Sequence, residues 1–112
     1  MIIGYIGIGD MGGPMAQNLL KAGFDVVVHD LQQDKVDALV AAGARAGAGP
    51  AEIADEAEIV MACLNTVEAS HAVAKAVAGG SAVRIFIDQS TTGPTTAKEL
   101  RPYFNDTNIQ ML

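Results

Sequence analysis

Several residue types are scarce in this 112-residue chain, and each scarcity excludes a class of protein. A single cysteine, Cys63, excludes a scaffold held together by disulfides. No apolar run approaches the roughly 20 residues that a membrane helix needs. The first residues also lack the basic segment of a signal peptide. The sequence therefore predicts a cytoplasmic protein that does not insert into a membrane.

Basic and aromatic residues are few as well. Seven Lys and Arg stand against thirteen Asp and Glu, which gives a formal charge of −6 and a pI near 4.6. Tryptophan is absent, and aromatic residues make up 4% of the chain. Such a surface repels the phosphates of nucleic acids and anionic lipids, and it offers few rings for base stacking. We therefore expect neither a nucleic-acid nor a membrane partner.

Apolar residues, in contrast, make up 50% of the chain, which suffices for one compact domain and excludes disorder. No repeat or linker divides the sequence, so residues 1–112 are predicted to form a single domain. The last residues are apolar and no polar tail follows them. We therefore expect this domain to be the amino-terminal part of a longer protein.

Short apolar runs alternate with helical patterns along the chain. Strands are predicted over residues 2–6, 24–29, 44–46, 58–63, 83–87 and 108–112. A first helix is predicted from Met11 to the segment 21–23, and a second from Val36 to Gly43. A short helix is predicted to begin at Pro50, and an alanine-rich helix follows the strand 58–63 and extends to about Val77. The last helix begins at Pro94, and Pro102 is expected to end or kink it. Strands that alternate with helices imply right-handed crossovers and parallel pairing. The predicted fold is an α/β doubly wound parallel sheet.

A glycine-rich motif joins the first predicted strand to the first helix: Gly7-Ile8-Gly9-Asp10-Met11-Gly12. In a dinucleotide-binding bend the first glycine permits the tight turn, the second admits the pyrophosphate and the third lets the helix pack on the strand. Amide groups and the positive end of the helix dipole then face the anion. The motif predicts a Rossmann dinucleotide-binding fold; the competing interpretation is a turn that only closes the βα unit. We expect the Asp10 carboxylate to point outward or to cap the helix.

Asp30 ends the second predicted strand, close to the spacing of about 20 residues at which this fold places an acidic residue. Its carboxylate can accept hydrogen bonds from both hydroxyls of the adenosine ribose, and it would repel a 2′-phosphate. Leu31, Gln32 and Gln33 follow, without an arginine that could bind such a phosphate. NAD is therefore predicted as the cofactor in preference to NADP.

Residues 7–19 resemble the signature of the β-hydroxyacid dehydrogenases, the group of 3-hydroxyisobutyrate dehydrogenase. The pairs Met11-Gly12, Met15-Ala16 and Asn18-Leu19 go beyond a general dinucleotide fingerprint. The likeness continues in segments 41–44, 49–52, 63–65 and 88–94, and so covers the whole chain. It implies an oxidoreductase that transfers a hydride between NAD(P) and a small 3-hydroxy acid.

The resemblance also implies roles for residues in two loops. In the family an Asp-x-Ser-Thr loop follows the fifth strand. The serine of this loop binds the substrate carboxylate, and the threonine approaches the nicotinamide. These positions correspond to Ser90 and Thr91 in this chain. From the residues alone, segment 90–92 serves equally well to turn the chain into the next helix. Leu64 and Asn65 correspond to a Leu-Pro pair that lines the cofactor path, with the proline replaced.

The family's general acid/base lysine belongs to a region beyond Leu112, so we assign no catalytic residue to this chain. The resemblance further implies a homo-oligomer for the full-length protein. Two alternatives stay open: a non-catalytic module that senses NAD(H), and a related imine or sugar-acid reductase.

No spacing typical of metal ligands occurs, and no metal is predicted. His71, without an acidic or serine partner in a triad arrangement, is expected at the surface. Cys63 is expected to pack as a small core residue.

Overall fold

A computed structural model describes residues 1–89 and 94–112, without the side chains of residues 9–11 and 94. In this part of the chain six strands form one sheet with the order β3-β2-β1-β4-β5-β6, and each neighbouring pair is parallel. The strands are β1 (Ile2–Ile6), β2 (Asp25–His29), β3 (Arg45–Ala46), β4 (Ile59–Ala62), β5 (Ile85–Asp88) and β6 (Gln110–Met111). The predicted doubly wound α/β sheet is confirmed.

Five α-helices and one 3-10 helix connect these strands within the described residues. They are α1 (Gly9–Lys21), α2 (Gln33–Ala41), α3 (Pro50–Ala54), α4 (Val67–Ala78), α5 (Pro94–Leu100) and the 3-10 helix η1 (Arg101–Phe104). Pro102, predicted to end or kink the last helix, lies inside η1, because a proline fits the first turn of a tighter helix. None of the helices in the described ranges is long and apolar enough to cross a membrane.

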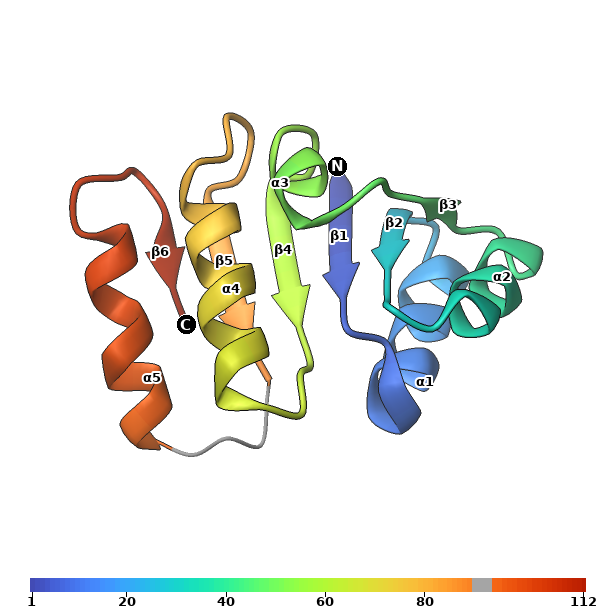
Figure 1. Ribbon diagram of the computed structural model, residues 1–112. Coiled ribbons are helices and arrows are strands. Elements are labelled where there is room, and N and C mark those ends of the chain that lie inside the picture. The colour runs from blue at the N-terminus through green and yellow to red at the C-terminus, as the bar shows by residue number, and fades with distance from the viewer. Residues whose placement is uncertain (90–93) are drawn as a thin grey trace.

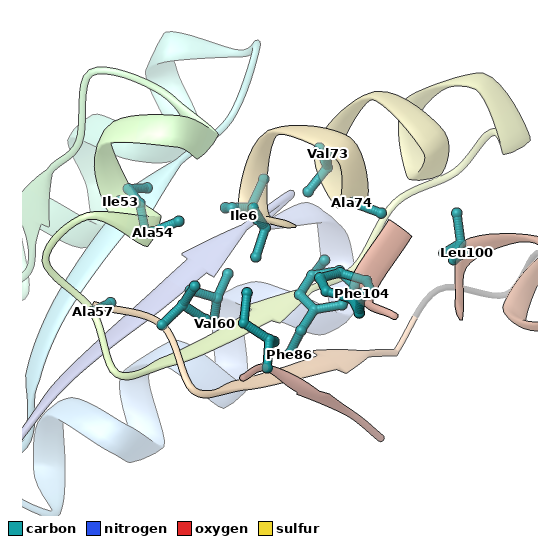
Figure 2. Close-up of a cluster of buried hydrophobic side chains, with 14 of the residues drawn as sticks. Ile6, Ile53, Ala54, Ala57, Val60, Val73, Ala74, Phe86, Leu100 and Phe104 are labelled. Atoms are coloured by element: carbon teal, nitrogen blue, oxygen red, sulfur yellow. The ribbon is translucent and has the colours of Figure 1, made fainter. Parts of the chain in front are cut away.

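The helices cover the two faces of the sheet in separate groups. Val26 and Val28 point to the face covered by α1 and α2, where Tyr5, Ala16 and Leu39 are also buried. Val27 points to the opposite face, toward a second cluster built on α3, α4 and η1. Figure 2 shows this second cluster, in which Ile53 of α3 and Val73 of α4 belong to the same buried group as Val60 of β4 and Phe86 of β5. Burial on both faces explains why these strands are continuous apolar runs.

All strands end at one edge of the sheet, where the candidate site lies. In Figure 1 the arrows of β1, β2, β4 and β6 point to the lower edge, and the β1–α1 and β4–α4 connections lie there. From β1 the chain proceeds outward through β2 to β3, and it then returns to place β4 on the other side of β1. Such a reversal leaves a crevice at the carboxyl ends of the strands, where ligands of this fold class bind.

His71 corrects one expectation. It is half-buried on α4, with Nε2 2.9 Å from Oε2 of Glu99 and Nδ1 2.8 Å from the hydroxyl of Tyr103. The rings of His71 and Tyr103 also meet edge to face, 5.7 Å apart. The acidic partner could not be identified from the sequence, because Glu99 and Tyr103 approach His71 only when α5 and η1 pack against α4. The cluster holds the last helical segment in place.

Two adjacent glycines after α4 provide a test of how the chain packs against α3 at this point. A Cβ at Gly80 would lie 2.6 Å from the carbonyl oxygen of Ala54, whereas a Cβ at Gly79 would have no neighbour closer than the Ala76 oxygen at 3.7 Å. Backbone atoms of Ala54 cannot yield without moving α3. We expect Gly80→Ala to lower the free energy of unfolding by about 2–3 kcal/mol, and Gly79→Ala to change it by less than about 0.5 kcal/mol. Urea denaturation followed by circular dichroism measures both; equal midpoints for the two variants would contradict the packing.

Candidate dinucleotide-binding site

The site begins at Gly7, where β1 turns sharply into α1. Gly7 has a φ of +77°, in the left-handed region that favours glycine. Its N–H donates to the carbonyl oxygen of His29 at 2.9 Å, which continues the β1–β2 pairing by one residue. A Cβ at this position would collide with the carbonyl oxygen of Cys63 and lie 2.7 Å from Cδ2 of Leu64. Both the dihedral angle and the lack of space require glycine here.

Gly12 allows the first turns of α1 to rest directly on β1. A Cβ at Gly12 would lie 3.0 Å from the carbonyl oxygen of Gly7 and 3.0 Å from Cε1 of Tyr5. Ile8, the N-cap residue of α1, makes no side-chain cap. Amide groups in the first turn of a helix have no partner within the helix, and they favour an anion. The predicted strand–glycine bend–helix arrangement is therefore present.

Asp30 follows β2 directly and fixes the glycine bend to the β2–α2 turn. Its Oδ2 accepts a hydrogen bond from the N–H of Ile8 at 2.7 Å, and its Oδ1 accepts one from the N–H of Gln32 at 2.8 Å. Each carboxylate oxygen retains capacity to accept a further hydrogen bond. Asp30 is thus held beside the bend in a position from which it can also accept from a ligand hydroxyl.

Leu64 and Asn65 lie in the connection between β4 and α4. Leu64 is half-buried and faces Gly7 closely, while Asn65 is exposed one residue further on. Thr66 then caps α4, because its Oγ1 accepts from the N–H of Ala69 at 3.1 Å. The structure therefore brings Gly7, Ile8, Asp30 and Leu64 together at the carboxyl edge of the sheet.

Several predicted site residues lie outside the described part of the chain. They are Ser90 and Thr91 as a whole, and the side chains of Asp10 and Met11. Their predicted roles stay predictions. Within residues 1–89 and 94–112, no group of three or more His, Cys, Asp or Glu residues is placed to hold a metal ion.

Tyr5 and Gln89 are residues that the sequence analysis did not assign to the site. The hydroxyl of Tyr5, whose residue is 0% exposed, donates to Oε1 of Gln89 at 2.6 Å. Burial raises the pKa of Tyr5 to about 12, and the nearby Cys63 contributes to the increase. A signal was available, because a tyrosine in a doubly covered strand needs a partner for its hydroxyl. The partner itself follows a different strand and could not be identified from local pattern.

Cys63 lies beside Tyr5 at the end of β4. It is half-buried and packs against the cluster under α1, as expected for a small apolar residue. Burial raises the pKa of its thiol, and the charge of Asp88 raises it further. The cysteine is therefore held as the neutral thiol, which suits packing and not nucleophilic chemistry.

A parallel sheet in this strand order, a glycine bend at the reversal point and a carboxylate after β2 together define a dinucleotide-binding domain. Comparison with known proteins agrees: residues 2–112 match the family described as the NAD binding domain of 6-phosphogluconate dehydrogenase. The chain belongs to the β-hydroxyacid dehydrogenase family, in which this domain is the amino-terminal NAD-binding domain. The resemblance found in the sequence is confirmed.

Individual relatives cover nearly all of this chain. Bovine mitochondrial 3-hydroxyisobutyrate dehydrogenase is 35% identical over 105 residues, which are 88% of this chain and 30% of the relative. The NAD-dependent L-serine dehydrogenase of Pseudomonas aeruginosa is 37% identical over 117 residues, covering 98% and 38%. The solved Mycobacterium tuberculosis 3-hydroxyisobutyrate dehydrogenase with L-serine superposes with a TM-score of 0.89 at 29% identity, covering 98% and 38%. The chain thus spans about a third of the length of these relatives.

The buried hydroxyl of Tyr5 predicts a pH dependence of stability. The folded chain keeps the Tyr5 proton up to a pKa of about 12, whereas the unfolded chain loses it near the ordinary value of 10.0. The free energy of unfolding should therefore fall as the pH rises from 10 to 12, by on the order of 2 kcal/mol. Tyr5→Phe should lack this decrease, and Tyr103→Phe should retain it. Urea midpoints measured across this pH range provide the test; parallel curves for the unmodified chain and Tyr5→Phe would contradict it.

Proposed function

We propose that this chain binds NAD(H) as the cofactor domain of an oxidoreductase that transfers a hydride between the cofactor and a small 3-hydroxy acid. The observation that carries the proposal is the contact of the Asp30 carboxylate with the Ile8 amide beside the left-handed Gly7. It joins an acceptor for ribose hydroxyls to a bend that fits a pyrophosphate.

Each part of the cofactor has its proposed residues in this chain. The bend of residues 7–12 binds the pyrophosphate through amide groups, and Asp30 accepts from the adenosine ribose. Leu64 and Asn65 line the path toward the nicotinamide, which Thr91 approaches. When bound, the nicotinamide supplies the hydride acceptor or donor, and the chain binds and orients it.

The proposed substrate is a small carboxylate, with Ser90 as the residue that binds its carboxyl group. Two relatives support this class, because the names of the bovine and Pseudomonas aeruginosa enzymes both refer to 3-hydroxy acids, 3-hydroxyisobutyrate and L-serine. They favour a hydroxyacid dehydrogenase over a non-catalytic sensor. An imine reductase from Myxococcus stipitatus shares the fold with a TM-score of 0.84, but at 17% identity it supports no shared substrate.

The proposal extends to the whole protein in three respects. No residue of this chain is proposed as the general acid/base, a role that the family gives to a lysine outside it. The full-length protein is proposed to be a homo-oligomer. Its proposed location is the cytoplasm, although the bovine relative is named as mitochondrial.

Calorimetric titration with NADH and NADPH tests the role of Asp30. The carboxylate should make NADPH bind about tenfold more weakly than NADH, because it lies where a 2′-phosphate would enter. Asp30→Asn should weaken NADH about tenfold and should remove most of the difference between the two cofactors. Asp106→Asn, which removes the same charge from the η1–β6 connection, is the matched control and should change neither affinity. Equal affinities in the unmodified chain would contradict the assignment of Asp30, and absence of binding would contradict the proposed function.

Gly7 and Gly13 provide a second matched pair. Alanine at Gly7 must adopt a φ of +77° and meets backbone atoms of Cys63, whereas alanine at Gly13 meets only Cγ2 of Ile8 at 3.7 Å. We expect Gly7→Ala to lower the free energy of unfolding by about 2–3 kcal/mol and to weaken NADH binding strongly. Gly13→Ala should retain both properties. NADH fluorescence titration and urea denaturation provide the measurements, and similar behaviour of the two variants would contradict the geometry of the bend.

A further inference from the structure

One partly buried hydrogen bond connects β1 to the residue that follows β5, although these two strands are not neighbours in the sheet. The hydroxyl of Tyr5, in β1, donates to Oε1 of Gln89, the residue after β5, at 2.6 Å. Strand β4 lies between β1 and β5, so the side chain of Tyr5 spans the width of one strand. This contact therefore connects the β1 side of the crevice with the β5 side, across β4.

The ring of Tyr5 supports the first turns of α1. Gly12 packs on it so closely that a Cβ there would lie 3.0 Å from Cε1 and 3.6 Å from Cζ. Met15, one turn further along α1, has its Sδ 3.6 Å from the Tyr5 hydroxyl. Tyr5 therefore contacts the helix whose first turn forms the proposed pyrophosphate site.

Gln89 is held at two points. Its backbone N–H donates to the carbonyl oxygen of Ala62 at 2.8 Å, which continues the β4–β5 pairing, and its side-chain oxygen accepts from Tyr5. With Oε1 occupied by the hydroxyl, the orientation of the carboxamide is defined, and Nε2 lies on the side away from the oxygen. Gln89 is thus held through both its backbone and its side chain at the carboxyl end of β5.

The environment makes this hydrogen bond persistent. Tyr5 is 0% exposed and Gln89 is half-buried, so the hydroxyl is shielded from water on the Tyr5 side. A distance of 2.6 Å is at the short end of the range for hydroxyl donors. Because burial raises the pKa of Tyr5 to about 12, the hydroxyl keeps its proton and remains a donor well above neutral pH.

The order of the strands indicates which half of a dinucleotide lies near Gln89. Asp30 follows β2, so the adenosine half belongs over the β2 side of β1, and the pyrophosphate belongs over the bend at Gly7. The other half must then extend across the reversal point, over the carboxyl ends of β4 and β5. Gln89 lies at that end of β5.

We propose that Tyr5 and Gln89 are positioning residues for the nicotinamide half of the dinucleotide. The hydrogen bond between them sets the place of Gln89 relative to the first turn of α1, and so relative to the pyrophosphate from which the nicotinamide half extends. This inference rests on the proposed function and deepens it. It predicts that loss of the Tyr5 hydroxyl weakens ligands that carry a nicotinamide and spares those that lack one.

Calorimetry with NADH and with ADP-ribose, which has no nicotinamide, separates the two halves of the cofactor. For Tyr5→Phe we expect the Kd of NADH to rise about fivefold and the Kd of ADP-ribose to stay within about twofold. Tyr103→Phe is the matched control, because it removes the only other tyrosine hydroxyl of the chain, which is bound to His71 away from the site. It should leave both Kd values unchanged.

A double variant distinguishes positioning from a contribution to stability alone. Tyr5→Phe leaves the Gln89 oxygen without its partner, whereas Tyr5→Phe combined with Gln89→Met removes both polar groups and should recover much of the lost stability. Under our proposal the double variant still binds NADH about fivefold more weakly than the unmodified chain and retains its affinity for ADP-ribose. If NADH affinity recovered together with the urea midpoint, the role would be structural and the inference wrong.

The remaining outcomes are also decisive. An equal change for both ligands, or no change for either, would overturn the positioning role while leaving the proposed function intact. If the unmodified chain bound neither NADH nor ADP-ribose, the proposed function would fail and this inference with it. Should Tyr5→Phe fail to fold, Gln89→Met alone must show the selective loss of NADH affinity for the inference to stand.

Discussion

The arrangement of the site depends on the crowding at the end of β1. Gly7 is paired with β2 through the carbonyl oxygen of His29, and its α-carbon faces the chain leaving β4 at Cys63 and Leu64. No side chain fits between them, so the polypeptide must turn there and start a helix at once. A left-handed glycine is the least costly way to make that turn. The bend, the helix start and the crevice are consequences of this one constraint.

Local amide groups, and not the overall field, favour an anionic cofactor in this protein. With a formal charge of −6 the chain repels a dinucleotide at long range. The start of α1 opposes this repulsion with the positive end of its dipole, an effect confined to the first turn. Asp30 reduces the cost of binding further, because its bond to the Ile8 amide holds the bend in one conformation before a ligand arrives. Binding strength is thus concentrated in a few preorganised contacts.

Features set by neighbouring residues could be predicted from the sequence, and features set by distant pairs could not. The run Val26-Val27-Val28, buried alternately on the two faces, identified a covered strand, and the glycine motif identified the bend. The last strand spans Gln110–Met111 and is shorter than the predicted residues 108–112, although Leu112 continues the hydrogen bonding to Phe86 and Asp88 of β5. The partners of His71 and Tyr5 escaped detection because they join segments brought together only by packing of the folded chain.

The identity of residue 5 illustrates why such a distant pair carries functional information. The ring of Tyr5 packs against Gly12, and phenylalanine would supply the same ring with no polar atom to satisfy. A buried hydroxyl without a partner costs about 1–3 kcal/mol, and the hydrogen bond that the Tyr5 hydroxyl donates to Gln89 offsets this cost. The net gain in stability over two apolar side chains is small. What the pair adds is a fixed distance and orientation between α1, whose first turn faces the proposed pyrophosphate, and the end of β5. Such a constraint serves a binding site more than a hydrophobic core.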